Sequence, residues 1–135
     1  RAIITTVVTA AFCFLCAQAQ AAACLKSDPF RTSKVTVDLC TRELSNSALT
    51  DKERARLLEQ RGNANYWQQE FNLAIEDFNK AIAIDSSLNE SRIQRGWAYL
   101  RVGQTESGFT DFSNALEQNP RSARAVFAIG YIYGY

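Results

Sequence analysis

Glycine recurs at a fixed interval through the C-terminal part of this 135-residue chain. Gly62, Gly96 and Gly130 stand 34 residues apart. The same interval joins six further pairs of identical or similar residues: Gln60 and Gln94, Asp77 and Asp111, Phe78 and Phe112, Ala81 and Ala115, Ile82 and Leu116, and Asp85 and Asn119. A period of this length is typical of stacked helical repeats. Such repeats usually bind other chains along an extended surface, so the interval predicts a binding module.

Two sequence blocks within the period resemble the tetratricopeptide repeat (TPR). The first block is Leu58-x-x-Arg61-Gly62-x-x-Asn65, then Arg92-x-x-Arg95-Gly96-x-x-Tyr99, then Val126-x-x-Ile129-Gly130-x-x-Tyr133. The second is Ala74-x-x-x-Phe78 with Ala81, then Gly108-x-x-x-Phe112 with Ala115 and Pro120. The family favours Leu at the positions of Arg61 and Arg95, and Pro at that of Ser86. The resemblance implies an all-α, TPR-type α-solenoid of antiparallel helix pairs, with two full repeats plus the first helix of a third.

The expected TPR domain covers residues 50–135, with repeats at about 55–88, 89–122 and 123–135, the last incomplete. Apolar residues recur at spacings of three, four and seven, which is typical of amphipathic helices. Helices are therefore expected near residues 51–67, 71–84, 88–101, 105–117 and 121–135. Three start signals support them: capping boxes at Thr50-x-x-Glu53 and Ser87-x-x-Glu90, and Asn119 before Pro120. We expect Gly62 and Gly96 to let paired helices lie close, with Phe78 and Phe112 filling the gap to the next pair.

The N-terminal segment has a different character. Residues 2–17 hold no charge and are mostly apolar, and small residues follow at Ala17-Gln18-Ala19. This pattern predicts a signal peptide over residues 1–21, removed on export. The 16 apolar residues are fewer than the roughly 20 that a transmembrane helix needs, which favours removal. A periplasmic or secreted protein is expected; membrane attachment through an uncleaved segment or a lipidated Cys24 is the alternative.

Four cysteines form two pairs. Cys13 and Cys16 have a redox-type spacing but lie inside the apolar segment, so we expect their removal. Cys24 and Cys40 would remain, and an oxidising compartment favours a disulfide between them, with two free thiols as the alternative. Closing that loop would restrain the unfolded chain by roughly 3 kcal/mol. A lead-in is expected over residues 22–49, with a short helix over 35–44. Its stretch from Cys24 to Leu44 resembles the cysteine-bearing lead-in of some exported proteobacterial TPR proteins, which implies that Cys40 lies on a helix before the first repeat.

Charge and composition restrict the function further. Arg1 is the only charged residue among the first 24, so residues 25–135 carry 14 basic and 14 acidic side chains. This balance makes nucleic acid an unexpected partner. The absence of His removes the commonest general base, and no glycine-rich phosphate loop occurs. We expect no enzyme, metal, cofactor or small-molecule substrate, and place Glu76, Asp77 and Asp111 on a solvated helix face.

The TPR resemblance also implies a concave groove. Five positions of the first helix in each of the first two repeats, and three in the incomplete third, would line it: Arg56, Glu59, Asn63, Tyr66 and Trp67, then Glu90, Ile93, Trp97, Leu100 and Arg101, then Arg124, Phe127 and Tyr131. The residues expected to contact a partner are Asn63, Tyr66, Trp67, Ile93, Trp97, Arg101, Arg124, Phe127 and Tyr131. Glu59 reverses the charge of the lysine with which some family members bind a peptide's C-terminal carboxylate. The aromatic residues instead favour an apolar peptide.

Packing between helices is the alternative role for the aromatic residues. It stays open for Trp67, Trp97 and Tyr131, whereas Tyr99 and Tyr133 match a family position that packs in the core. The function expected is a non-catalytic, protein- or peptide-binding scaffold of the cell envelope. An accessory TPR domain of a larger exported enzyme or transport complex is the alternative. The final apolar run also leaves self-association through the open C-terminal repeat as an option.

Overall fold

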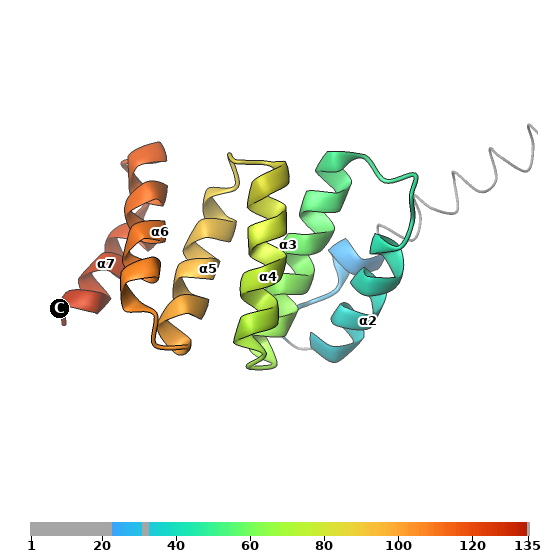
Figure 1. The fold of residues 1–135 in the computed structure, drawn as a ribbon, viewed down its shortest axis with the longest axis horizontal. Helices are drawn as coiled ribbons and strands as arrows, with labels where there is room; N and C mark the ends of the chain where they lie inside the picture. Colours follow the sequence, from blue (N-terminus) through green and yellow to red (C-terminus); the bar gives the residue numbers. More distant parts are fainter. Residues whose placement is uncertain (1–22, 31–32, 135) are drawn as a thin grey trace, which may run out of the picture.

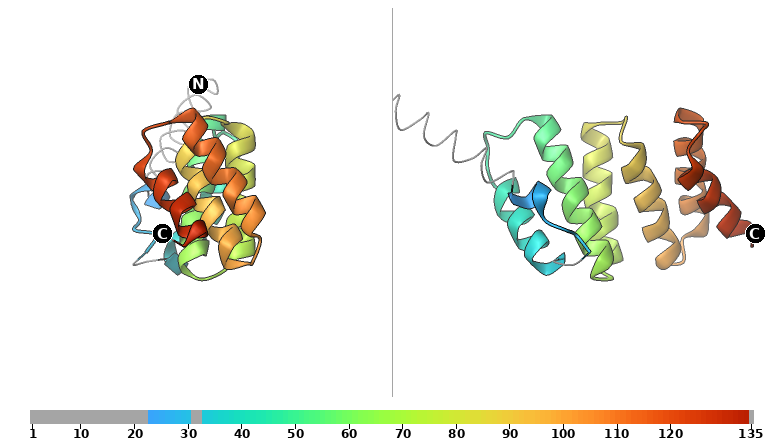
Figure 2. Two further views of the ribbon diagram at one scale, coloured as in Figure 1. Left: turned by 90° about the vertical axis from the view of Figure 1, so that its left-hand side faces the viewer. Right: turned by 180° about the vertical axis from the view of Figure 1, so that it is seen from behind.

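The computed structural model describes residues 23–30 and 33–134. Its helices include α2 (Ser33–Leu44), α3 (Asp51–Trp67), α4 (Phe71–Ile84), α5 (Asn89–Arg101), α6 (Thr105–Gln118) and α7 (Ala123–Tyr133). Within the described residues the chain forms no strand. The antiparallel pairs α3–α4 and α5–α6 stack side by side, and α7 follows them as the first helix of a third pair (Figures 1 and 2). The predicted all-α solenoid is confirmed.

The expected signal peptide, with Cys13 and Cys16, lies outside the described residues. In the part of the chain that is described, no helix is both long and apolar enough to cross a membrane.

One of the three predicted helix starts is confirmed. At the start of α3, the Thr50 hydroxyl oxygen accepts from the Glu53 amide at 3.3 Å, and the Thr50 amide donates to the Glu53 carboxylate at 2.8 Å. The box predicted at Ser87 is wrong, because α5 begins after Leu88 without a side-chain cap, and the Ser87 hydroxyl donates to Asp85 instead, at 2.6 Å.

The start predicted at Asn119 and Pro120 is also wrong. Ser122 caps α7 by accepting from the Ala125 amide at 3.3 Å. Pro120 therefore lies in the turn that precedes the helix. Despite these errors, the boundaries of the helices from α3 to α7 lie within two residues of those expected.

The repeating glycines lie against the repeating phenylalanines of their own helix pairs. A Cβ placed on Gly62 would lie 2.9 Å from Cε1 of Phe78, and one placed on Gly96 would overlap the Phe112 ring more closely still. Both rings are fully buried. The sequence predicts that the phenylalanines fill the gap to the next pair; in the structure each ring also packs on the glycine of its own pair. Phe112 also reaches the next helix, because it packs in one cluster with residues of α7.

Alanine substitutions at Gly96 and Gly130 test this contact. Gly96→Ala should lower the free energy of unfolding by about 1–3 kcal/mol, because the methyl group overpacks the buried ring. Gly130→Ala should be neutral or stabilising by up to about 1 kcal/mol, since no described atom apart from the adjoining residues and backbone of its own helix lies within 4 Å of the added carbon, and alanine favours the helix. Urea denaturation followed by circular dichroism measures both. Equal destabilisation at Gly96 and Gly130 would contradict the packing role.

Two buried ion pairs repeat with the same period. Arg61 forms a bidentate ion pair with Asp77, with Nε–Oδ2 at 2.9 Å and Nη2–Oδ1 at 2.6 Å. Arg95 pairs with Asp111 in the same way, with Nε–Oδ2 at 2.7 Å and Nη2–Oδ1 at 2.5 Å. The expectation that these aspartates lie on a solvated face is wrong, because each is only 3% exposed. Burial disfavours the charge of Arg95, but the hydrogen bond and charge of Asp111 outweigh this and raise the pKa of Arg95.

A double substitution distinguishes the cost of leaving one partner of the Arg61–Asp77 ion pair unpaired from the net contribution of the whole pair. Arg61→Leu should destabilise the chain by about 3–5 kcal/mol, because it leaves the buried Asp77 charge without a cation. Among the described residues, Asp77 would then keep the side-chain amide of Asn65 as its hydrogen-bond donor, now at 3.0 Å. Adding Asp77→Leu should restore most of the loss, since an apolar pair of similar volume replaces a buried ion pair at little cost. In urea denaturation, a double variant no more stable than the single one would refute this interpretation.

The lead-in before the repeats packs as an additional second helix. Arg61 donates to the Thr41 hydroxyl of α2 at 3.1 Å, just as Arg95 donates to the Asn79 side chain of α4 at 2.6 Å. The expected helix over 35–44 is present and begins two residues earlier, at Ser33. Helix α2 thus lies before α3 as α4 lies before α5.

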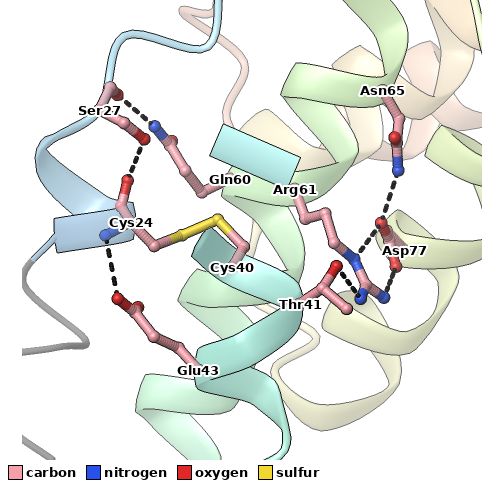
Figure 3. The surroundings of a disulfide bond; sticks show 9 residues. All are labelled: Cys24, Ser27, Cys40, Thr41, Glu43, Gln60, Arg61, Asn65 and Asp77. Carbon is pink, nitrogen blue, oxygen red and sulfur yellow. Dashed lines mark hydrogen bonds and ion pairs between the residues drawn. A yellow bond between two sulfur atoms is a disulfide. The ribbon is translucent and has the colours of Figure 1, made fainter. Parts of the chain in front are cut away.

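A disulfide joins Cys24 to Cys40, as predicted (Figure 3). Both cysteines are fully buried against Leu57 of α3. Beside them, the Glu43 side chain is 4% exposed and accepts from the Cys24 amide at 3.3 Å. Burial raises the pKa of Glu43 above its ordinary value.

The raised pKa gives stability a defined pH dependence. Glu43 binds its proton more tightly in the folded than in the unfolded chain, so its ionisation costs stability as the pH rises above the ordinary glutamate pKa. Glu43→Gln removes this cost. The variant should melt at a higher temperature than the wild type at pH 7, with the difference vanishing near pH 3. Calorimetry measures both temperatures, and a difference that does not change with pH would disprove the assignment.

Candidate functional site

An aromatic hollow of about 480 Å³ opens where the first helices of the successive pairs meet. Helices α3, α5 and α7 contact one another there in sequence. The hollow is lined by Tyr66, Trp97, Leu100, Arg101, Thr105, Phe127, Tyr131 and Ile132. Five residues predicted to contact a partner are thereby brought together: Tyr66, Trp97, Arg101, Phe127 and Tyr131.

Three aromatic rings make up much of its wall. The Trp97 ring lies 5.2 Å from that of Tyr131 and 6.3 Å from that of Phe127, measured between centroids. Phe127 and Tyr131 are 66% and 60% exposed, whereas Trp97 is half-buried. Trp97 also packs on Phe112, at 5.3 Å, so one side of its ring belongs to the core and the other to the hollow. The hollow therefore presents exposed apolar surface next to the buried core.

A cation lies at the rim. The Arg101 guanidinium is stacked over the Phe71 ring at 4.6 Å from its centroid, and the Phe71 ring lies 5.4 Å from that of Tyr66. Arg101 is exposed, and no hydrogen-bond acceptor for it occurs among the described residues. Stacking thus fixes the guanidinium while its N–H groups remain free to bind a carbonyl or carboxylate.

Ile93 does not belong to the hollow. Its predicted contact with a partner is wrong, because it is 2% exposed and packs with Phe112, Ala125 and Ala128 in the core. The prediction that Tyr133 packs in the core is also wrong, since Tyr133 is 64% exposed. Its ring makes an edge-to-face contact with the Phe109 ring, 6.0 Å away between centroids.

Three other predicted residues lie outside the hollow. Trp67 is 50% exposed but faces Phe30 of the lead-in, 4.8 Å away between ring centroids. Arg124 forms an exposed ion pair with Glu90. Asn63 is half-buried on α3 and does not line the hollow.

Two lining residues were not predicted. Ile132 directly follows Tyr131, and Thr105 begins α6. A tight turn, in which Gly103 has a φ of 81°, brings Thr105 beside the end of α5. Because Thr105 belongs to a second helix, the first-helix positions of the TPR pattern could not identify it.

The sequence matches no protein-family model and no curated protein. The structure, however, is similar to several solved ones. MamA superposes with a TM-score of 0.69 at 19% identity, over 76% of this chain and 58% of that one. The second TPR domain of human RPAP3, in complex with an HSP70 peptide, superposes with a TM-score of 0.68 at 24% sequence identity, over 76% of this chain and 82% of that one. The first TPR of Spaghetti (RPAP3), bound to an HSP90 peptide, superposes with a TM-score of 0.68 at 22% sequence identity, over 75% of this chain and 77% of that one.

This chain thus spans little more than half of the MamA chain. At such identities the similarities bear on the fold alone. That fold is a TPR-type α-solenoid.

Proposed function

We propose that the chain is a non-catalytic TPR scaffold, exported to the cell envelope, that binds a protein or peptide through the aromatic hollow. The observation that carries this proposal is the cluster of Trp97, Phe127 and Tyr131, two of them more than half exposed. Covering their rings with apolar side chains would stabilise a complex by about 25 cal/mol per Å² removed from water. Arg101 would bind a carbonyl or carboxylate of the same peptide.

An apolar segment fits the hollow better than an acidic C-terminus does. Two structurally similar domains are bound to peptides, one from HSP70 and one from HSP90. In this chain Glu59 accepts from the Ser91 hydroxyl at 2.7 Å, which holds a carboxylate where lysine would be needed to bind an acidic terminus. The aromatic rings then supply most of the binding energy, as Trp and Tyr often do.

Export is supported by the disulfide. Cys24 and Cys40 are joined and buried, and such bonds persist in oxidising compartments. A membrane-attached form, through an uncleaved N-terminal segment or a lipidated Cys24, would place the same hollow at the membrane surface. Mass spectrometry of the mature protein distinguishes these forms, and the lipidated form would require a free Cys40.

Two tyrosines of α7 give a matched test of the hollow. Peptides are first selected on the wild-type chain from a random phage library, and their affinities are measured by fluorescence anisotropy. Tyr131→Ala should weaken binding about 30-fold, because a buried aromatic hot spot contributes about 2 kcal/mol. Tyr133→Ala removes an equally exposed ring from outside the hollow, so it should leave the affinity unchanged. Equal effects of both substitutions would contradict the proposal.

A further inference from the structure

A second surface lies between α2 and α4, with α3 as its floor. Two adjoining hollows of about 220 and 390 Å³ share Arg61 and Lys80 there, and together we name them the α2–α4 trough. Figure 3 shows Arg61 spanning from Thr41 of α2 to Asp77 of α4 in this region. None of the residues that line the trough also lines the aromatic hollow.

The larger hollow of the trough has an apolar floor. Leu44, Leu58, Ala83 and Ile84 provide it, from all three helices. Helix α4 lines the trough from Leu73 to Ile84, a length of about 17 Å at 1.5 Å per residue. This wall is long enough for a helix of about three turns.

The corresponding positions of the next repeat are polar. Arg92, Asn114, Glu117 and Gln118 stand 34 residues after Leu58, Lys80, Ala83 and Ile84. Arg92 donates to the Gln118 side chain at 3.5 Å and to the Ser86 carbonyl at 2.5 Å, so this counterpart is occupied by its own hydrogen bonds. Two repeats that agree in their core thus differ at this surface.

Positive charge borders the apolar floor. Within the described residues, the Arg54 guanidinium donates to two backbone carbonyls and no side chain, those of Leu44 at 3.2 Å and Asn46 at 3.3 Å. Lys80 is exposed on α4. Neither cation has a carboxylate within ion-pair distance among the described residues. Glu76 lines the other hollow, one turn from Lys80.

We propose that the α2–α4 trough binds an amphipathic, acidic helix of a protein partner. The apolar face of that helix would cover Leu44, Ala83 and Ile84, which are exposed or half-buried, and its carboxylates would pair with Arg54 and Lys80. Helices that lie in apolar grooves are a recurring mode of recognition, and complementary charges set their orientation and partner. Because the trough and the aromatic hollow are separate, one copy of the chain can hold two partners together.

A pair of designed peptides tests this proposal. One is a fluorescein-labelled helix of 14 residues with leucines on one face and glutamates along both edges, and the other has lysine in place of each glutamate. Fluorescence anisotropy at moderate salt should show saturable binding of the glutamate peptide to the wild-type chain. The lysine peptide should bind at least about tenfold more weakly, a difference of about 1.4 kcal/mol.

The chain supplies its own matched variant. Lys80→Asn with Ala83→Glu installs the residues that α6 carries at the same register, so the helix should fold as before, and circular dichroism checks this. This double variant should weaken binding of the glutamate peptide at least about tenfold, while Tyr131→Ala leaves it unchanged.

Three outcomes would overturn the proposal: no saturable binding, equal affinity of the two peptides, or equal affinity of the double variant and the wild type. Loss of binding in Tyr131→Ala would place the peptide in the aromatic hollow and would also overturn it. Peptides selected for the aromatic hollow should bind the double variant as they bind the wild type, so failure at one site is distinguishable from failure at the other.

Discussion

The contact of a phenylalanine ring with a glycine is the constraint on which the rest of the structure depends. The Phe78 ring lies where a side chain at position 62 would be, and the Phe112 ring does the same at position 96. Each contact sets how closely the two helices of a pair approach. Trp97 directly follows Gly96 and packs on the same Phe112 ring, so this contact also places an indole at the mouth of the aromatic hollow.

The repeat architecture could be predicted because it follows from the spacing of residues that are close together in the sequence. A glycine, a phenylalanine and small residues at fixed offsets specify a helix pair, and the helix boundaries follow to within two residues. The pattern of a single helix predicts a solvated face for Asp77 and Asp111, because it carries no information on the arginine that the paired helix places against each of them. The sequence nevertheless contains a signal for these ion pairs, since Arg61 with Asp77 and Arg95 with Asp111 recur together at the same offset.

The site was predicted less completely, because the position of a residue within the repeat does not determine whether its side chain is buried. Ile93 and Phe127 stand at the same position of successive repeats, yet Ile93 is 2% exposed and Phe127 is 66% exposed. Ile93 is covered by α6 and α7, whereas no described helix covers the equivalent side of α7. Trp67 likewise meets Phe30, a lead-in residue that the TPR pattern does not include. Burial at such positions depends on the next element in the stack, which a repeat pattern cannot specify.

The indole N–H signal of Trp97 in a ¹H–¹⁵N spectrum tests most directly whether the Phe112 contact positions the hollow. The neighbouring rings of Phe112 and Tyr131 lie within 5.3 Å of the indole between centroids and should shift its resonance. Phe112→Leu should move the Trp97 indole signal and abolish its response to a bound peptide, while the Trp67 signal stays in place. An unchanged Trp97 signal that still responds to peptide would contradict the dependence of the hollow on this contact.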